Sequence, residues 1–445
     1  MRAHPLFLLL IAGSAEAAEL RGFVASALSR SPALAESRAR VQEARAAGDE
    51  AFYDRFPRLS ARASAARGDD PLFAFGTLLQ QRRVAQADLA PDASNRPGYR
   101  TAVHGALELG LPLFTGFELT RARELARLGA SEAEASGGAA AQAVRLRAAD
   151  GYIRGVKDRE LLAELEARIA SALAAVESAE RLKKQGLVLG SDHQAALAIL
   201  SGLKAWRARA AADRTAHDSE LSVLTGGPAP ESGDAFNDWT PPIEDDATLV
   251  AEALASRPDL RAAGLRVDQA GVRERGATRS LMPTVDAFAA VETSADGLSP
   301  GAAGRIFGLR ASLPFGDPAY LSRLGRTRAA TRAAGAVRAQ AEDEIRVEVL
   351  GRAAALRGLI AALPDLNESL ARARDSLDMV RPLYREGRQS IMEVLRAEET
   401  VARLQEARLE ARYRLRAGWA SLRAAQGRLD DEAVVVLAGS LEKVR

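Results

Sequence analysis

The chain has 445 residues, of which 47% are hydrophobic and 27% charged, and this length suggests two or three ordinary domains. Its 61 basic and 59 acidic residues give a formal net charge of +2, so the overall charge does not point to a nucleic-acid partner. The absence of cysteine excludes disulfides and thiolate chemistry, and the four histidines form no ligand pair at helical spacing. We therefore expect no metal and no other cofactor.

Residues 1–18 have the pattern of a signal peptide. Arg2 precedes the apolar run 6–12, and the small-x-small sequence Ala15-Glu16-Ala17 follows it. We expect cleavage near Ala17 or Ala18 and export across the inner membrane; the alternative is an ordinary buried N-terminal helix. No later stretch of the sequence has the ~18 apolar residues that a membrane helix needs. If the chain enters a second membrane, it does so as strands.

The mature sequence contains one unit twice. Ser31-Pro32-Ala33-Leu34 matches Arg257-Pro258-Asp259-Leu260, an offset of 226 residues from Pro32 to Pro258. Leu111-Pro112-Leu113 matches Leu313-Pro314-Phe315 at an offset of 202, and the difference of 24 residues predicts a longer loop in the first copy, within residues 67–100. We therefore divide the chain into a signal peptide, a first repeat, a linker rich in Gly, Pro and acidic residues, a second repeat and a C-terminal tail, at residues 1–18, 19–227, 228–248, 249–427 and 428–445.

Each repeat is predicted to hold a helix, two strands and a long helical hairpin. Across residues 103–113 the odd positions are apolar or glycine, whereas the even positions include His104 and Glu108. Such alternation over about ten residues is typical of transmembrane barrel strands, but a soluble antiparallel sheet with one face in water alternates in the same way. The pattern alone leaves both interpretations open. The predicted strands lie at about residues 58–67, 102–113, 284–292 and 305–313.

Long helices follow the strands in both repeats. Apolar residues recur at alternating spacings of three and four across 162–179 and across 356–384, which predicts coiled-coil seams. The second outgoing helix, 318–386, would be about 100 Å long at 1.5 Å per residue, and Pro364 should bend it. No compact globular domain needs such a helix, whereas a tube across a periplasm does. Short turns at residues 186–191 and 387–391 lead into return helices over 192–224 and 392–422.

The extra loop of the first repeat, residues 67–100, is unusual for a surface loop. It contains Phe73-Ala74-Phe75-Gly76 and, shortly after, Leu78-Leu79-Gln80-Gln81. These apolar residues predict a short amphipathic helix near residues 76–84. The sequence assigns this insert no role.

In their duplicated order these features resemble the TolC family of outer membrane efflux proteins. The resemblance covers the mature chain, and no single motif in it is specific. It is carried by three kinds of element in each copy: the Pro-x-Leu helix starts Pro32-Ala33-Leu34 and Pro258-Asp259-Leu260, the strand ends Leu111-Pro112-Leu113-Phe114-Thr115-Gly116 and Leu313-Pro314-Phe315-Gly316, and the hairpin tips Gly186-Leu187-Val188 and Tyr384-Arg385-Glu386-Gly387.

The resemblance implies a mainly α-helical fold with a membrane β-barrel portion. Three identical chains would contribute four strands each to one twelve-stranded barrel in the outer membrane of a Gram-negative-type bacterium. An α-helical coiled-coil tunnel would continue it through the periplasm. The implied partners are two further copies of the chain, outer-membrane lipid, a periplasmic adaptor docked at the tips (Gly186, Leu187 and Gly387) and an inner-membrane pump. The implied function is the exit channel of a tripartite efflux or type I secretion system, without a lipid anchor because no cysteine follows the signal peptide.

The resemblance also implies a gate at the hairpin tips. Tyr384 matches the family's gate tyrosine and Asp192 its hydrogen-bond acceptor, with Ser191 in place of a threonine. Gln389 stands where a family member has an arginine, so one charged link is absent. We expect Tyr384 and Asp192 to hold neighbouring hairpins together.

Two further residues are implied at the narrowest part of the tunnel. Glu393 matches a carboxylate that forms a ring around the closed aperture, whereas Arg396 replaces a second carboxylate. Because Arg396 lies one helical turn beyond Glu393, it would partly cancel the ring if it turned inward.

Two other classes of protein compete with a channel. A periplasmic coiled-coil scaffold would explain the seams, but not why strand pairs recur at matching points of both copies. An enzyme would need a chemical signature, and the sequence has no Gly-rich phosphate loop, no Gly-x-Ser-x-Gly and no His-Glu-x-x-His. We therefore predict a channel and not an enzyme. Cargo and pump class are not encoded in these motifs, because the pump and adaptor select what is exported.

Overall fold

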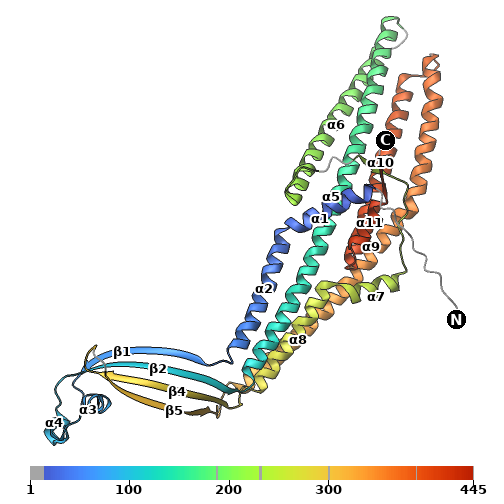
Figure 1. Cartoon of the computed structure of the whole chain (residues 1–445). Helices are drawn as coiled ribbons and strands as arrows, with labels where there is room; N and C mark the ends of the chain where they lie inside the picture. Colours follow the sequence, from blue (N-terminus) through green and yellow to red (C-terminus); the bar gives the residue numbers. More distant parts are fainter. Residues whose placement is uncertain (1–14, 187–188, 230–232, 299–300, 387, 444–445) are drawn as a thin grey trace, which may run out of the picture. The chain divides into compact units, whose positions relative to one another are not determined.

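A computed structural model of the chain describes residues 15–186, 189–229, 233–298, 301–386 and 388–443. Most of the expected signal peptide and the tip residues Leu187 and Gly387 lie outside these ranges. The described residues form mainly helices, with four long strands, and the elements follow one another in the same order in both repeats (Figure 1). No helix in the described ranges is both long and apolar enough to cross a membrane.

The chain divides into two compact units, and each unit draws on both sequence repeats. The sheet unit comprises Arg40–Glu132 and Gly264–Val337. The hairpin unit comprises Met1–Ala39, Ala133–Ala263 and Arg338–Arg445. The duplication therefore repeats the order of the elements along the chain, whereas each compact unit combines residues from both copies.

The sheet unit is built around a four-stranded antiparallel sheet with the order β1-β2-β4-β5. The central pair, β2 with β4, joins the first repeat to the second, and a register shift between Pro112 and Phe114 interrupts its ladder. The strands begin and end within about three residues of the predicted positions: β1 Arg58–Gly68, β2 Arg100–Thr115, β4 Thr284–Ala295 and β5 Ala302–Ser312.

The pairing register assigns every strand residue to a face, because directly paired residues share a face and neighbours along a strand do not. One row across the sheet is Leu59, Leu109, Ala289 and Phe307. This apolar face also contains Ala61, Ala63, Ala65, Leu107, Leu111, Ala287, Val291 and Leu309, with Arg67 and Arg305 toward the loop ends of the strands.

The opposite face is polar in character. It contains Ser60, Arg62, Ser64, His104, Glu108, Asp286, Glu292, Ser294 and Arg310. The ion pair between Arg62 and Glu108 (Nη2 to Oε2, 3.8 Å) links neighbouring strands on this polar face. The largest side chains of the apolar face, Leu59, Phe307 and Leu309, are solvent-exposed in the single chain. A soluble sheet buries its apolar face, and this one exposes it.

Besides the short helices between β1 and β2, four longer helices contribute residues to the sheet unit. They are α2 Pro32–Tyr53, α5 Glu118–Lys184, α8 Pro258–Thr278 and α9 Tyr320–Arg385. Cross-repeat ion pairs connect α5 with α8 in this unit, from Arg266 to Glu132 (2.6 Å) and from Arg275 to Glu124 (3.0 Å). Helix α9 continues through Pro364, where a bend was expected.

The insert of the first repeat lies between β1 and β2. It folds into α3 Pro71–Gln80, a 3-10 turn η1 Gln86–Leu89 and α4 Pro91–Asn95. Helix α3 begins about five residues before the predicted amphipathic helix. The reason is local: Asp70 caps the helix by accepting a hydrogen bond from the Phe73 amide (2.9 Å), and Pro71 occupies its first position.

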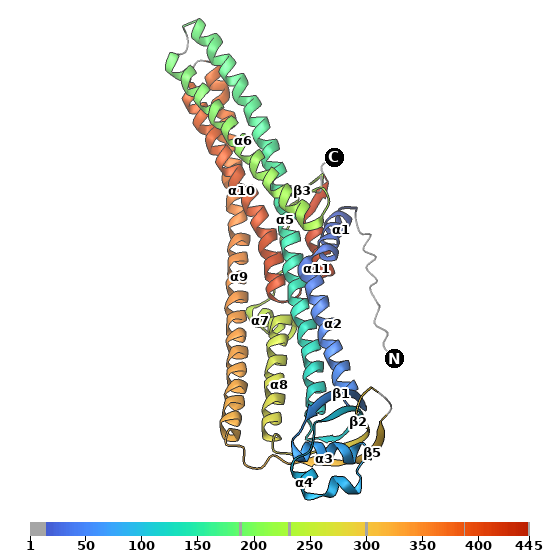
Figure 2. The same ribbon diagram turned by 90° about the vertical axis from the view of Figure 1, so that its left-hand side faces the viewer.

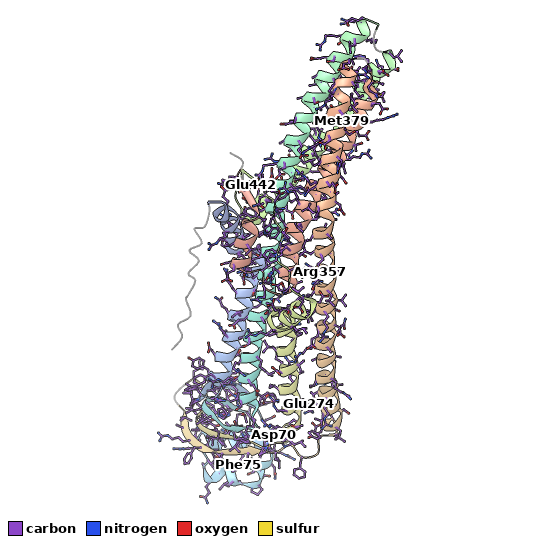
Figure 3. All side chains as sticks on the ribbon, turned by 90° about the vertical axis from the view of Figure 1, so that its right-hand side faces the viewer. Asp70, Phe75, Glu274, Arg357, Met379 and Glu442 are labelled. Carbon is purple, nitrogen blue, oxygen red and sulfur yellow. The ribbon has the colours of Figure 1, made fainter. Side chains whose placement is uncertain are left out.

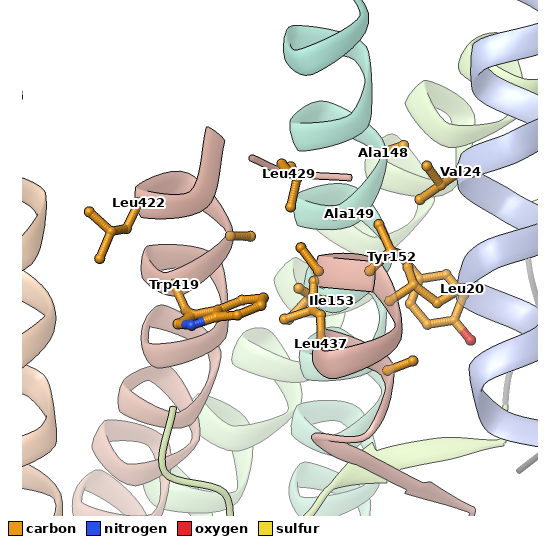
Figure 4. Packing of buried hydrophobic residues seen from close by; sticks show 14 of the residues in the cluster. Leu20, Val24, Ala148, Ala149, Tyr152, Ile153, Trp419, Leu422, Leu429 and Leu437 are labelled. Carbon is orange, nitrogen blue, oxygen red and sulfur yellow. The ribbon is translucent and has the colours of Figure 1, made fainter. Parts of the chain in front are cut away.

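The hairpin unit contains the larger core of the chain. Its return helices are α6 Gly190–Thr225 and α10 Ile391–Ala425, and its short elements are α1 Ala15–Arg30, α7 Asp246–Ser256, α11 Asp431–Ala438, β3 Asp234–Phe236 and β6 Leu441–Lys443. Leu20, Tyr152, Ile153, Trp419 and Leu437 pack together there (Figure 4). These five residues come from α1, α5, α10 and α11, so the C-terminal tail is an integral part of the fold.

The two repeats end their return helices in the same way. Arg30 donates to the carbonyl of Gly226 (3.0 Å), and Arg257 donates to the carbonyl of Ala425 (3.1 Å). Gly226 and Gly427 both have positive φ, of 66° and 72°, a conformation that glycine adopts without strain. The arginine before each Pro-initiated helix therefore binds the end of a return helix in both copies.

Candidate functional site

The candidate site lies where the two long hairpins of the hairpin unit turn. Helix α5 ends at Lys184 and α6 begins at Gly190, while α9 ends at Arg385 and α10 begins at Ile391. Gly186 turns the first hairpin with a φ of 74°. Ser390 caps α10 by accepting a hydrogen bond from the Met392 amide (3.1 Å). These turns fix where the predicted gate residues lie.

A small apolar core holds the two hairpins together near the tips. Ala196 of α6 packs with Leu370 and Leu377 of α9 and with Ile391 and Leu395 of α10. Figure 2 shows the two hairpins side by side along this stretch. The core places the first turn of α6 near the last turn of α9, which is where the sequence put Asp192 and Tyr384.

Tyr384 is half-buried against this core, and its hydroxyl is a buried donor without a hydrogen-bond partner among the described residues. Burial, and to a smaller extent the negative charge of Asp192, raises the pKa of Tyr384 above its ordinary value. The hydroxyl therefore stays protonated at neutral pH. The expected hydrogen bond from Tyr384 to Asp192 is not formed within the single chain, although the two groups are close enough to interact electrostatically.

Asp192 lies in the first turn of α6, where the helix N-terminus favours a carboxylate. Its Oδ1 is 3.5 Å from the Ser191 hydroxyl, which is a weak contact. Gln389 is exposed in the second turn. The structure thus brings Asp192 and Ser191 together and leaves Gln389 at the surface of the tip.

Glu393 occupies the corresponding first turn of α10 and pairs with Arg396. Nη1 of Arg396 donates to Oε1 of Glu393 across 3.1 Å, and both side chains are exposed, by 70% and 49% respectively. Arg396 therefore turns toward the carboxylate and not away from it.

A groove between the hairpins was not anticipated from the sequence. It has a volume of about 880 Å³ and is lined by residues of α5, α6, α9 and α10, among them Arg168, Trp206 and Leu395. Nη2 of Arg168 donates to the carbonyl of Ala402 (3.3 Å) and so ties α5 to α10. Trp206, a tryptophan within the predicted return helix 192–224, is a sequence signal that could have indicated this groove. The described residues contain no group of three His, Cys, Asp or Glu that could hold a metal ion.

Solved structures share this fold over nearly the whole chain. CusC, described as forming a transmembrane channel, aligns with a TM-score of 0.78 at 17% identity over 92% of both chains. The outer membrane protein VceC from Vibrio cholerae aligns with a TM-score of 0.76 at 20% identity over 92% of this chain and 96% of its own. The open state of the MtrE outer membrane channel of Neisseria gonorrhoeae aligns with a TM-score of 0.75 at 19% identity over 93% and 90%. No curated protein sequence matches significantly.

The chain has the fold of these outer-membrane channel proteins, and the predicted fold class is confirmed. Residues 249–428, the second repeat, match the family model described as outer membrane efflux protein. This match and the shared fold confirm the predicted resemblance to that family.

Proposed function

We propose that this chain is one subunit of a homotrimeric outer-membrane exit channel, through which a tripartite efflux or type I secretion system passes its cargo. The observation that carries the proposal is the four-stranded sheet whose apolar face is exposed. Leu59, Leu109 and Phe307 form part of one row on that face and are each solvent-exposed in the single chain. Lipid is the environment in which an exposed apolar strand face is stable.

Trimer formation follows from the open edges of the sheet. Among the described strands, β1 and β5 each have a neighbour on one side only. An unpaired strand edge in hydrocarbon would leave backbone groups without hydrogen bonds, at a cost of several kcal/mol per group. Pairing β5 of one copy with β1 of the next removes both edges. Three copies then close a barrel of about twelve strands, within the size range of membrane barrels.

The hairpin tips are the proposed docking and gating region. Gly186, Leu187 and Gly387 belong to the turns that would meet a periplasmic adaptor, itself bound to an inner-membrane pump. Asp192 and Tyr384 would link neighbouring hairpins in the closed state. This is supported by the hydroxyl of Tyr384, which has no partner within the described part of the chain, since a buried donor without an acceptor costs about 1–3 kcal/mol. A neighbouring subunit would supply such an acceptor.

Glu393 is proposed to line the aperture three times, once per subunit. Because Arg396 pairs with it in each chain, the ring would carry little net negative charge. The channel would therefore discriminate weakly between cations and anions.

A periplasmic scaffold without a channel is the competing function. It would leave the apolar face of the sheet in water, which is unfavourable by about 25 cal/mol per Å² of apolar surface. Membrane fractionation separates the two functions. We expect the protein to stay in the membrane pellet after salt and carbonate extraction, and to run as a trimer when it is dissolved in detergent. Release by carbonate as a monomer would reject the channel.

A further inference from the structure

The insert between β1 and β2 has no counterpart in the second repeat. β1 ends at Gly68 and β2 begins at Arg100, whereas β4 ends at Ala295 and β5 begins at Ala302. The insert therefore lies at the loop ends of the strands, the ends that are not followed or preceded by long helices. Figure 1 shows α3 beside these loop ends, with α4 farther out, and Figure 3 labels Asp70 and Phe75 of the insert there.

Helix α3 covers one particular face of the sheet. It packs against β2 and β4 with Ala74, Thr77 and Leu78, which are all buried. At the loop end of the sheet, Ala102 is 0% exposed and Ser294 5% exposed. Both lie on the polar face, since Ser294 pairs with His104, which is two residues along β2 from Ala102. On the opposite face at the same level, Thr293 and Ala65 are exposed.

Polar contacts fix the insert in this position. The Gln81 side-chain amide donates to the carbonyl of Thr101 (3.0 Å), and Arg82 donates to the carbonyl of Ala303 (2.8 Å). Arg83 forms an ion pair with Asp296. Arg82 has a φ of 56°, a left-handed conformation that is unfavourable for arginine and that persists only where surrounding contacts hold it. The insert is thus bound to β2, to β5 and to the residue that follows β4.

The outer side of α3 is also apolar. Leu72 is 82% exposed and Leu79 54% exposed. These two residues are seven apart, which places them on one helix face, away from the face that holds Ala74 and Leu78. A surface helix of a soluble protein would carry polar residues on that side.

We propose that α3 narrows the external mouth of the duct and limits the size of the molecules that pass it. This inference rests on the proposed function, in which the polar face of the sheet lines the lumen. Eight-stranded barrels are filled by their own side chains, while barrels of about 16–18 strands hold an open aqueous channel. A barrel of about twelve strands lies between them, and three helices of about 10–12 Å diameter inside it occupy much of the lumen. The apolar faces with Leu72 and Leu79 then point toward the three-fold axis.

The rate at which reagents added from the external side reach the lumen tests the constriction independently of the periplasmic tips. The chain contains no cysteine, so a single Ser60→Cys provides a unique thiol on the polar face at the helix end of β1, beyond α3. Proteoliposomes with the external side outward are treated with a small charged methanethiosulfonate or a bulky polyethylene-glycol maleimide. We expect the small reagent to modify Ser60→Cys quickly and the bulky reagent to modify it slowly. Replacing residues 69–99 with an Asn-Gly hairpin turn, which fits the pairing of Gly68 with Arg100, should make the bulky reagent fast as well.

A second variant covers the case in which the shortened chain does not fold. Ala74→Glu with Leu78→Glu places charges on the buried face of α3 and should release it from the sheet while leaving both strands intact. This variant should also increase the rate at which the bulky reagent modifies Ser60→Cys. If the bulky reagent modifies Ser60→Cys at the same rate with and without the insert, the proposed constriction is wrong. Leu59→Cys, one residue away on the apolar face, is the control for the proposed function. If Leu59→Cys reacts as fast as Ser60→Cys in every background, the barrel itself is wrong and not only the constriction.

Discussion

Arg396 and Glu393 form an ion pair across one turn of α10, with 3.1 Å between Nη1 and Oε1. An exposed pair of this kind contributes at most about 1 kcal/mol to stability. Its consequence is electrostatic, because each subunit then presents a neutralised carboxylate where the family resemblance implies an acidic ring.

We therefore expect only a weak preference for cations in the unmodified channel. Arg396→Asp should increase that preference, since it removes the counter-charge and adds a second acid one turn away, and Glu393→Ala should abolish it. The reversal potential across a salt gradient measures all three proteins. Arg372→Asp is the matched control, because Arg372 forms a similar exposed pair with Glu368 on α9. Identical reversal potentials in all variants would place Glu393 outside the pore.

The two faces of β2 should respond differently to a charge. Leu109 lies on the apolar face and Glu108 on the polar face, one residue apart. Leu109→Arg should cost about 2–4 kcal/mol and reduce the yield of membrane-inserted trimer, since the charge would face lipid near mid-strand. Glu108→Arg should insert normally. Trimer yield in outer-membrane fractions is the measurement, and equal damage from both changes would contradict the face assignment.

Strand positions and faces were predictable because alternation is a local property of the sequence. Residues 103–113 alternate clearly, and β2 with its apolar face lies where they predicted. The start of α3 was misplaced because hydrophobic spacing was followed in preference to the Asp70-Pro71 capping signal. The pairing of Glu393 with Arg396 could be predicted for the same local reason, since residues three apart share a helix face.

Contacts between distant segments were not predictable. The contact of Arg168 with Ala402 joins residues 234 positions apart, and no local pattern marks either end. The resemblance carried Tyr384 and Asp192 to the tips, but the lack of a partner for the hydroxyl depends on packing that only the structure shows. The apolar side of α3 with Leu72 and Leu79 could not be interpreted from the sequence either, because the sheet register is needed to identify the face that α3 covers.

Arg257 should contribute to stability in a pH-dependent way. Its guanidinium donates to Asp259 (2.6 Å) and to Glu348 (2.5 Å), and this hydrogen bonding holds the pKa of Asp259 below its ordinary value. A carboxyl whose pKa is lower in the folded state contributes stability above its unfolded pKa. That stability is lost as the pH falls through the folded value, in this case below about pH 4. Asp259 is about half exposed, so the contribution is about 1 kcal/mol or less.

Thermal unfolding at pH 7 and pH 3 tests this. Asp259→Asn should lower the melting temperature at pH 7 and leave it nearly unchanged at pH 3. Arg257→Leu should be more damaging at pH 7, by about 2 kcal/mol, since Glu348 and the carbonyl of Ala425 also lose their donor. Asp365→Asn, at an exposed position of α9, is the control. A pH-independent effect of Asp259→Asn would show that the carboxylate charge does not matter there.

The tip tyrosine gives the most direct test of gating. In the single chain the Tyr384 hydroxyl is buried and has no acceptor among the residues that the structure describes, and its raised pKa keeps it a donor at neutral pH. In the proposed closed trimer it donates to Asp192 of a neighbouring hairpin, and each such hydrogen bond is worth about 1 kcal/mol. Three bonds around the axis then favour the closed state by about 3 kcal/mol, or about a hundredfold in population.

Tyr384→Phe combined with Asp192→Ala should therefore raise single-channel conductance in planar bilayers without lowering trimer yield. Tyr413→Phe is the matched control, because Tyr413 already donates to Asp150 (2.9 Å) within its own chain and lies away from the tips. It should leave conductance unchanged while costing some stability. If the double variant conducts like the unmodified channel, Tyr384 does not hold the aperture closed. If it loses the trimer as well, the two side chains serve assembly, and the hydroxyl finds its acceptor in a contact that gating does not break.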